Sequence, residues 1–298
     1  MGGGVLLCTF DMDKKKLALL GLFGSLIWLS VFYFPDDKLN LVFCDVGQGD
    51  AVLITKGFDQ ILIDGGPDDK VLTCLSENMP FWDKKIEIVA LTHPEADHLS
   101  GLLAVLDKYE VDFFLTGPEG DSSAKFAELS SKLKDQSSKL TRRNPYEGEK
   151  IKLGEITLET LWPEREWVAN KISNSERVLG ASTSGHLNDF SLVFLLSFRN
   201  KKVLLMGDAD SRVQDKILSA VGGSQLAVSG VDILKFPHHG SKTGMTEEFL
   251  ETISPKEAVI SVGKNSYGHP TKEALDLLEK FGVLIRRTDL EGEIRYSF

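Results

Sequence analysis

The sequence predicts a layered α/β fold, and three features of its 298 residues support this class. Hydrophobic residues make up 42% of the chain and charged residues 26%, as in a globular protein rather than a disordered one. From residue 39 onward, short apolar runs alternate with amphipathic stretches, which is the pattern of mixed strands and helices. This order occurs in two similar halves, and no linker divides residues 39–298. We therefore expect one domain in which helices cover sheets.

The N-terminal segment contains an uncharged apolar run, Leu17–Phe34, with Lys14, Lys15 and Lys16 immediately before it. Such a run is just long enough to cross a bilayer as a helix. The lysines predict that residues 1–16 stay in the cytoplasm. We therefore predict a single-pass signal anchor in the cell membrane, with the domain of residues 39–298 on the extracytoplasmic side.

Two other interpretations of this run stay open. A cleaved secretory signal has the same polarity, but no Ala-x-Ala site follows the run. A buried core helix is the third interpretation, although the segment has no polar face.

In the first half of the domain, strands separated by glycine-containing turns alternate with helices. The predicted elements are strands Leu39–Asp45, Ala51–Thr55 and Gln60–Asp64, helix Val71–Met79, strand Ile86–Leu91, helix Gly101–Lys108, an exposed helix within 121–140, and hairpin strands Lys150–Leu153 and Ile156–Leu161. Residues 163–188 follow as a long polar segment without a clear period. A loop of that length is usually functional or mobile.

The second half repeats this logic. Its predicted elements are strands Ser191–Phe198 and Lys202–Met206, helix Ala209–Ser219, strand Ile233–Lys235, helix Thr246–Ile253, strand Ala258–Ser261, helix Lys272–Phe281, and the closing segments Ile285–Arg287 and Glu293–Ser297.

Charge and cysteine content limit the function classes. The net charge of −10 lies wholly in residues 39–298, which argues against a basic nucleic-acid wrapper. An enzyme that neutralises phosphates with metal is compatible with this charge. Cys8, Cys44 and Cys74 do not make a disulfide scaffold. A Cys44–Cys74 bridge is one interpretation, but we expect two buried free thiols.

The histidines give the sharpest functional signal. Each of the six lies beside Gly, Pro, Asp, Asn or another His, at a predicted strand end or in a loop: His93, His98, His186, His238, His239 and His269. None lies in the middle of an apolar element, whereas structural histidines would scatter more widely.

The first histidine segment is Thr92-His93-Pro94-Glu95-Ala96-Asp97-His98, between a strand and a helix. It supplies four candidate ligands, His93, Glu95, Asp97 and His98. Imidazole and carboxylate together suit zinc, manganese or iron. The alternative is a helix-capping turn in which Asp97 or Ser100 is the cap.

Two segments in the second half add candidate ligands. Asp208 follows an apolar strand and a glycine, a position that presents a carboxylate at a sheet edge or simply caps the next helix. His238 and His239 are adjacent and therefore point in different directions. We expect one of them to bind metal and the other to support it or contact substrate.

Other polar turns are candidates for supporting roles. Residues 240–243 offer backbone, hydroxyl and ammonium donors for an anion, and His269 is a candidate general acid or phosphate donor, with a turn histidine as the alternative. The turns Gly47–Asp50 and Asp64–Gly66 lack the features of phosphate-binding loops. Asp50 and Asp64 are instead candidates for holding the metal ligands in place.

Together these segments resemble the metallo-β-lactamase-fold domain at the C-terminus of ComEC-type DNA-uptake channel proteins. The segments are Asp45–Ala51, Leu62–Gly66, Leu91–His98, Leu204–Asp208, His238–Ser241 and Ser261–Pro270, and the resemblance covers about residues 39–298. The many membrane helices of the channel are missing here, so we do not expect this chain to be the channel itself.

The resemblance implies an αββα sandwich with a site for one or two divalent ions, zinc or manganese, at one edge between the sheets. His93, Asp97 and His98 match the His-x-His-x-Asp-His motif of the superfamily, and Glu95 replaces the second histidine. This replacement implies a weakened first metal position or a preference for manganese.

The remaining ligands of the superfamily match less completely. Asp208 matches the bridging aspartate, and the His238–His239 pair matches the late histidine motif. The mid-chain histidine has no secure match, and His186 and Asn188 are the candidates for its place. A full two-metal site is therefore in question.

The function that the resemblance implies is metal-dependent phosphodiester hydrolysis, a nuclease acting on DNA at the outer membrane face during DNA uptake. The implied catalytic residues are Asp97, Asp208 and His269, and the implied substrate-binding residues are Ser241, Lys242, Tyr267 and His269. The expected partners are DNA or another phosphodiester, the membrane through residues 17–34, and a separate DNA-channel protein.

Two rival functions stay open. One is a hydrolase of a lactam, lactone or thioester on the same scaffold, since fold does not fix function. Glu95 counts against it, because those enzymes usually keep the second histidine. The other is a non-catalytic module beside a channel, which a weak metal site would favour.

Overall fold

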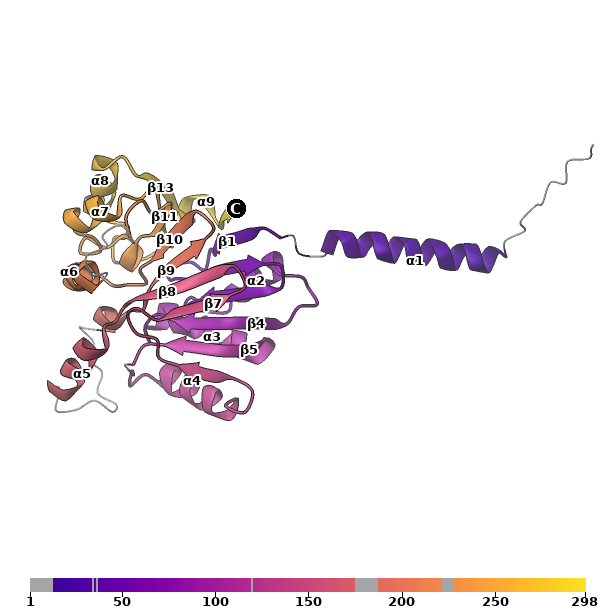
Figure 1. Cartoon of the computed structure of the whole chain (residues 1–298), viewed down its shortest axis with the longest axis horizontal. Helices are drawn as coiled ribbons and strands as arrows, with labels where there is room; N and C mark the ends of the chain where they lie inside the picture. Colours follow the sequence, from indigo (N-terminus) through magenta and orange to yellow (C-terminus); the bar gives the residue numbers. More distant parts are fainter. Residues whose placement is uncertain (1–12, 34, 36, 119, 175–186, 221–227) are drawn as a thin grey trace, which may run out of the picture.

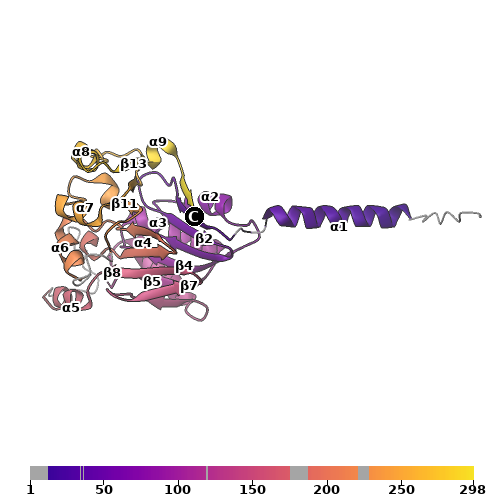
Figure 2. The same cartoon turned by 45° about the horizontal axis from the view of Figure 1, so that its top comes forward.

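The computed structural model describes residues 13–33, 35, 37–118, 120–174, 187–220 and 228–298. In this part of the chain, two mixed sheets stack face to face, and helices cover their outer faces (Figure 1, Figure 2). This αββα arrangement confirms the predicted layered fold.

The two sheets contain seven strands each within the described ranges. The first is built from β1 (Leu39–Phe43), β2 (Val52–Lys56), β3 (Asp59–Ile63), β4 (Lys85–Leu91), β5 (Glu110–Thr116), β6 (Thr141–Arg143) and β14 (Ile294–Ser297). The second is built from β7 (Lys150–Leu153), β8 (Ile156–Trp162), β9 (Val193–Phe198), β10 (Lys201–Leu205), β11 (Ile233–Lys235), β12 (Glu257–Ile260) and β13 (Leu284–Arg287).

Strand order follows the same rule in both sheets. The orders are β14-β1-β2-β3-β4-β5-β6 and β13-β12-β11-β10-β9-β8-β7. Antiparallel pairs run from β14 to β3 and from β7 to β10, and the pairs beyond β3 and β10 are parallel. The two halves of the sequence thus build the same pattern twice.

The helices are named in chain order. They are α1 (Lys14–Tyr33), α2 (Val71–Asn78), α3 (Ala96–Lys108), α4 (Ala124–Asp135), α5 (Arg165–Asn174), α6 (Ser211–Ala220), α7 (Glu247–Ile253), α8 (Lys272–Lys280) and α9 (Thr288–Glu291), with 3-10 turns η1 (Leu187–Phe190) and η2 (Pro237–Gly240). Buried residues of α2, α3 and α4 share a core with the first sheet, and those of α6, α7 and α8 share one with the second.

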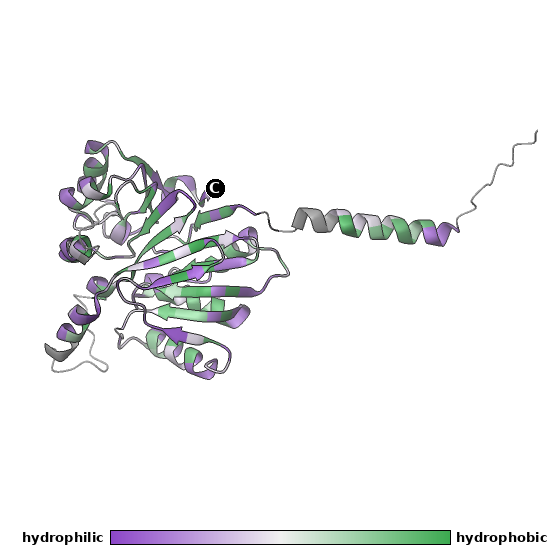
Figure 3. Ribbon diagram, in the orientation of Figure 1, coloured by the Kyte–Doolittle hydropathy of each residue, from purple (hydrophilic) through white to green (hydrophobic). Residues whose placement is uncertain are grey.

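The alternation of side chains along each strand separates three apolar layers. In β1, Leu41 and Phe43 point between the sheets, whereas Val42, and Cys44 directly after the strand, point toward the helices. The central strands are therefore apolar on both faces, which explains their continuous hydrophobic runs (Figure 3).

Several predicted boundaries differ from the structure. Helix α3 begins at Ala96 and not at Gly101, so Asp97 and His98 lie in its first turn. Strands β5 and β6 were absent from the sequence prediction, because Asp112 interrupts the apolar run of β5 and β6 is short and exposed. The closing segments β13 and β14 lie in different sheets, and β14 returns to pair with β1. The polar segment 163–188 contains α5.

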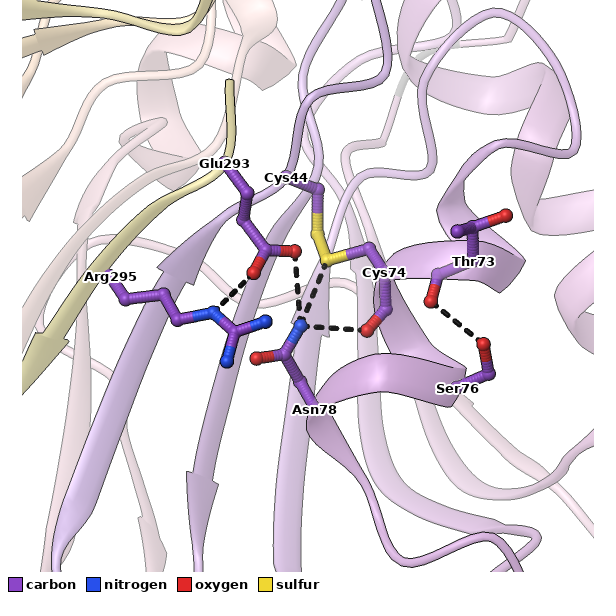
Figure 4. Close-up of a disulfide and its surroundings, with 7 residues drawn as sticks. All are labelled: Cys44, Thr73, Cys74, Ser76, Asn78, Glu293 and Arg295. Carbon is purple, nitrogen blue, oxygen red and sulfur yellow. Dashed lines mark hydrogen bonds and ion pairs between the residues drawn. A yellow bond between two sulfur atoms is a disulfide. The ribbon is translucent and has the colours of Figure 1, made fainter. Parts of the chain in front are cut away.

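The expectation of free thiols at Cys44 and Cys74 is wrong, because the structure joins them in a disulfide with Cα atoms 5.8 Å apart (Figure 4). The side chain of Cys44 points from the end of β1 toward the helix layer, where α2 presents Cys74. Beside the bridge, Asn78 donates to the backbone oxygen of Cys74 and to Glu293. The disulfide thus links the end of β1 to α2. Its first cysteine, Cys44, directly precedes the loop that carries Asp50.

The apolar run at the N-terminus is helical and extends away from the sandwich as α1 (Figure 1). Its described large apolar side chains are exposed, Leu19 at 69% and Trp28 at 66% among them. None of the helices searched in the described part of the chain has the combined length and hydrophobicity needed to cross a membrane. This finding does not support the anchor predicted over 17–34.

Candidate metal centre

The candidate ligands converge where strands from both sheets end. His93 follows β4, Asp97 and His98 occupy the first turn of α3, and Asp208 follows β10. His239 lies in η2, directly after β11. Because these strands belong to two stacked sheets, their ends bring residues from distant parts of the sequence to one edge of the sandwich.

Asp208 lies at the centre of this cluster. Its Oδ1 is 3.4 Å from Nε2 of His98, and its Oδ2 is 3.7 Å from Nε2 of His239 and 3.9 Å from Nε2 of His93. Asp97 Oδ2 lies 3.2 Å from Nε2 of His239. These are distances between groups that face a common centre.

The orphaned atoms of the cluster fit a divalent cation. Nε2 of His93, His98 and His239 and Oδ1 of Asp208 are buried and have no hydrogen-bond partner among the described residues. Buried polar atoms are normally paired, so such a group needs an explanation. Two donor sets, His93–His98–Asp208 and Asp97–His98–His239, each bring three ligand atoms within 4.8 Å of one another. Imidazole nitrogen and carboxylate oxygen are the ligands expected for zinc or manganese.

The other ring nitrogen of each histidine is held from behind. Nδ1 of His98 is 2.9 Å from Oδ2 of Asp64, and Nδ1 of His239 donates to the backbone oxygen of Ser261 at 2.9 Å. Nδ1 of His93 is 3.1 Å from the hydroxyl of Ser191. Such contacts fix the ring orientation and aim Nε2 at the centre. The structure therefore places Asp64, a predicted supporting residue, behind His98.

Charge pairing is strong in the cluster. Burial opposes the charged form of His239, but Asp208 and Asp50 beside it raise its pKa to about 10. Burial also opposes the charged form of His98, yet Asp208 and Asp64 raise its pKa well above the usual value. In return, His239 and His98 hold the pKa of Asp208 far below its ordinary range against the effect of burial. Without a metal, these imidazolium groups balance the carboxylates.

Two residues respond mainly to burial. Burial and the charge of His98 lower the pKa of His93 to about 3, so this ring is neutral and ready to accept a cation. Burial, followed by the charges of Asp208 and Asp97, raises the pKa of Glu95 to about 7. The Oε2 atom of Glu95 lies 3.9 Å from Nε2 of His93, on the exposed side of the cluster.

The two adjacent histidines take different directions. His239 is buried and joins the cluster, with its ring centroid 5.4 Å from that of His98. His238 points outward, where its ring lies 5.6 Å from that of His269. Both have positive φ angles, 51° and 52°, in a region that non-glycine residues rarely adopt. This backbone geometry separates the two rings.

An open cleft of about 570 Å³ leads to the cluster. Its walls include Pro94, Glu95, Lys125, His238, Tyr267 and His269. The side chain of Asn265 holds the loop that carries Tyr267 and His269, because its Oδ1 accepts from the backbone N–H of Tyr267, Gly268 and His269.

Some predicted site residues lie elsewhere. Ser241 and Lys242 are not among the described residues that line this cleft. Ser241 is buried against Thr243, and Lys242 is exposed 3.8 Å from Glu273. Asn188 is buried, with Nδ2 3.5 Å from Nδ1 of His238. His186 lies outside the described residues.

Two lysines at the site had no predicted role. Lys125, from α4, donates to the hydroxyl of Ser100 at 2.6 Å and lines the cleft. Lys235 is buried at the end of β11 and contacts Asp50. The sequence offered one signal for Lys235, because it is the single charged residue in the apolar run Ile233–Phe236. A charged side chain in a buried strand normally needs a partner.

Solved structures of low sequence identity share the fold. The metallo-beta-lactamase fold protein YhfI from Bacillus subtilis matches with a TM-score of 0.54 and 12% identity, over 87% of this chain and 100% of that one. Zn(2+)-bound PqqB from Methylobacterium extorquens matches with a TM-score of 0.51 and 12% identity, over 84% of this chain and 88% of that one.

Curated relatives come from competence and recombination systems by name. ComE operon protein 3 of Bacillus subtilis is 24% identical over 99% of this chain and 38% of its own length. Recombination protein 2 of Haemophilus influenzae is 25% identical over 85% of this chain and 28% of its own length. Competence protein ComA of Neisseria gonorrhoeae is 24% identical over 88% of this chain and 33% of its own length. The chain thus spans about a third of the length of these relatives. These matches confirm the predicted resemblance to competence proteins of the ComEC type.

The sequence model of the Metallo-beta-lactamase superfamily matches residues 44–264, from the end of β1 through the loop after β12. This range contains the candidate ligands His93, Asp97, His98, Asp208 and His239 and most of both sheets. The chain therefore belongs to the metallo-beta-lactamase superfamily.

Proposed function

We propose that the chain is a metal-dependent phosphodiesterase that cuts DNA. One observation carries the metal-dependent part: three buried Nε2 atoms and a buried carboxylate oxygen, all without hydrogen-bond partners among the described residues, face one centre below an open cleft. Divalent cations held there would supply Lewis-acid activation of water and of the phosphoryl group at neutral pH.

Asp208 and Asp97 are the proposed catalytic carboxylates. Asp208 is buried between the three imidazoles, where it would bridge two cations or orient one. Asp97 lies nearer the cleft with its pKa lowered against the effect of burial by His239 and His98. It therefore stays ionised at neutral pH, ready to bind a cation and align the attacking water.

His269 is proposed to contact the scissile phosphate. Burial and the charge of His238 lower its pKa below the usual value for histidine. A neutral ring at pH 7 donates a hydrogen bond to a phosphate oxygen more readily than it donates a proton. We therefore assign His269 to phosphate binding ahead of general acid catalysis.

The cleft walls suit a nucleotide chain. Lys125 adds a cation to the lining of the cleft, and the exposed ring of Tyr267 also lines it, with its centroid 5.9 Å from that of His269. An aromatic face offers a stacking surface for a base. The names of the curated relatives, which refer to competence and recombination, are consistent with DNA as the substrate. The net charge of −10 favours transient rather than tight binding.

Placement outside the cytoplasm and attachment to a membrane form a separate part of the proposal. The Cys44–Cys74 disulfide supports an oxidising compartment. The exposed apolar side chains of α1 support association with lipid or with a separate channel protein in the membrane. Alkaline extraction of membranes from cells expressing the full chain tests attachment. Release into the soluble fraction would contradict it.

The central test uses the full chain after removal of metal with a chelator. Labelled single- and double-stranded DNA, a simple phosphodiester and a β-lactam are incubated with Mn²⁺, Zn²⁺ or Mg²⁺. We expect metal-dependent cutting of DNA. Asp208→Asn keeps the shape of the side chain but loses its charge, so it should reduce the rate at least about 100-fold.

Asp276→Asn is the matched control, because Asp276 is an exposed carboxylate that pairs with Lys272 on α8. It should cut at the rate of the unaltered chain. The proposal fails if Asp208→Asn cuts as fast as this control, or if the folded chain hydrolyses the lactam and leaves both phosphodiesters intact.

A further inference from the structure

Lys235 is the one lysine or arginine that is buried among the described residues, with 1% of its surface exposed. Its ammonium group contacts Oδ2 of Asp50 and lies 3.7 Å from Oδ1 of Asp208, and Lys235 is not among the described residues that line the cleft. It also donates to the backbone oxygen of Gly207 at 3.0 Å. A buried charge is costly unless it is paired, so this lysine needs its carboxylate partners.

The carboxylates around it divide the cluster into two sides. On the inner side lie Asp50 and Asp64, both buried, behind the ring of His98. On the outer side lie the buried Nε2 atoms of the histidines, together with Asp97, which lines the cleft. Asp208 lies between the two sides, since it contacts both Lys235 and the Nε2 atom of His98.

In the described part of the chain, the side chains of this cluster form four sets that could each hold a metal ion, and three of the sets include His98. Two of these sets, Asp50–Asp64–His98 and Asp50–Asp208–His239, use Asp50. Asp50 is the carboxylate that the ammonium group of Lys235 contacts. A divalent ion in either set would face a fixed positive charge at short range, and like charges repel strongly in a buried site.

We infer that Lys235 serves as the resident cation of the inner side, which neutralises Asp50 and confines divalent ions to the outer donors. It also holds Asp208 from behind, so that this carboxylate faces the histidines. Lys235 is thus a positioning residue, and its charge determines how many ions the cluster binds. The inference rests on the metal site of the proposed function and not on its substrate.

The experiment counts metal ions on the full chain. Unaltered protein and Lys235→Met are stripped with a chelator and titrated with Mn²⁺, and bound ions are counted by native mass spectrometry and by elemental analysis. We expect Lys235→Met to bind one more Mn²⁺ per chain. The double variant Lys235→Met with Asp50→Asn removes both charges and should return to the unaltered number.

Lys256→Met is the matched control, because Lys256 pairs with Asp232 on the surface, away from the cluster. Its ion count should not change. Equal, non-zero counts in Lys235→Met and the unaltered chain would overturn the inference. If Lys235→Met is unfolded without metal, Mn²⁺ should restore its fold by replacing the ammonium group, and failure of this rescue would also overturn it.

No nucleic acid enters this experiment, so its outcome is independent of DNA cutting. An unaltered chain that binds no Mn²⁺, Zn²⁺ or Mg²⁺ would instead refute the metal site of the proposed function.

Discussion

Glu95 is the residue at which this chain departs from the superfamily motif. Its side chain is 39% exposed and sits at the rim of the cluster, beside His93. Burial and the neighbouring carboxylates Asp208 and Asp97 raise its pKa to about 7. At neutral pH this carboxyl group is therefore partly protonated in the absence of a cation.

This shift predicts a pH effect on the metal-free protein. Because the pKa of Glu95 is 4.5 when unperturbed and about 7 in the folded state, its ionisation opposes folding increasingly as pH rises through that window. Glu95→Gln removes this effect, so the variant should gain stability relative to the unaltered chain between pH 4.5 and 7. After discounting for exposure, we expect about 1–2 kcal/mol. Urea unfolding with a chelator present at both ends of the window measures the difference.

With saturating Mn²⁺, the unaltered chain should be more stable than Glu95→Gln, since a bound cation favours the ionised carboxylate. A difference that is independent of pH in the chelator would contradict the assigned cause.

For single residues, the sequence predicted the side chains that point into the cluster better than those that line the cleft. His93, Asp97 and His98 are close in sequence on a strand end and a helix start, so their convergence followed from local structure. Lys235 and Lys125 were missed, because a lone lysine does not reveal whether a carboxylate from another element faces it. Ser241 and Lys242 follow the η2 turn but do not line the cleft, which depends on backbone angles that the sequence does not show.

Among the elements, helix α3 and the turn after β3 are in unusually close contact. The N–H of Gly65 donates to the backbone oxygen of His98 at 2.7 Å, and that of Gly101 donates to Gly66 at 3.0 Å. A Cβ atom on Gly101 would collide with the backbone oxygen of Gly65. This contact holds the first turn of α3, which carries Asp97 and His98, against the turn that carries Asp64.

Gly101→Ala tests this contact. In an ordinary helix interior, alanine is more favourable than glycine by about 1 kcal/mol. Here we expect the opposite sign, a loss of about 1–3 kcal/mol, because backbone atoms cannot move aside as a flexible side chain would. Urea unfolding measures the change, and Ser131→Ala on the exposed face of α4 is the control expected to gain stability. A stabilised Gly101→Ala would show that α3 does not depend on this close approach.

The boundaries of the helices and strands show which parts of the fold could be predicted from the sequence. The strands of the core were predicted because their apolar runs are continuous, as in β4 and β10. The start of α3 was placed five residues late, because Asp97, His98 and Ser100 resemble loop residues while the backbone of 96–100 is already helical. The disulfide was missed because pairing depends on how α2 packs on the sheet, which a spacing of 30 residues does not reveal.

In the whole molecule, the site exists only because the two halves are stacked. The first half supplies His93, Asp97 and His98, and the second supplies Asp208 and His239. The repeated strand order places the ends of β4 and β10 at the same edge. In contrast, α1 extends away from the sandwich and supplies nothing to this edge in the described part of the chain (Figure 1).

Deletion of residues 1–38 should therefore leave the sandwich intact. We expect the midpoint of thermal unfolding to change by less than about 3 °C, since the removed helix buries little apolar surface. Calorimetry on the full chain in detergent and on the shortened chain in the same detergent measures the change. The shortened chain should also stay dispersed without detergent, because the exposed apolar helix is gone. A large fall in the midpoint would show that α1 is part of the folded unit.

The pairing of β1 with β14 has a consequence for how this domain can be joined to other chains. Leu39 and Phe298 exchange two backbone hydrogen bonds, so the first and last residues of the sandwich are direct neighbours. A short connector between them would permit circular permutation, with new ends opened in an exposed loop far from the candidate metal centre. The sandwich can also be inserted into a surface loop of an unrelated host protein, because its first and last residues lie next to each other.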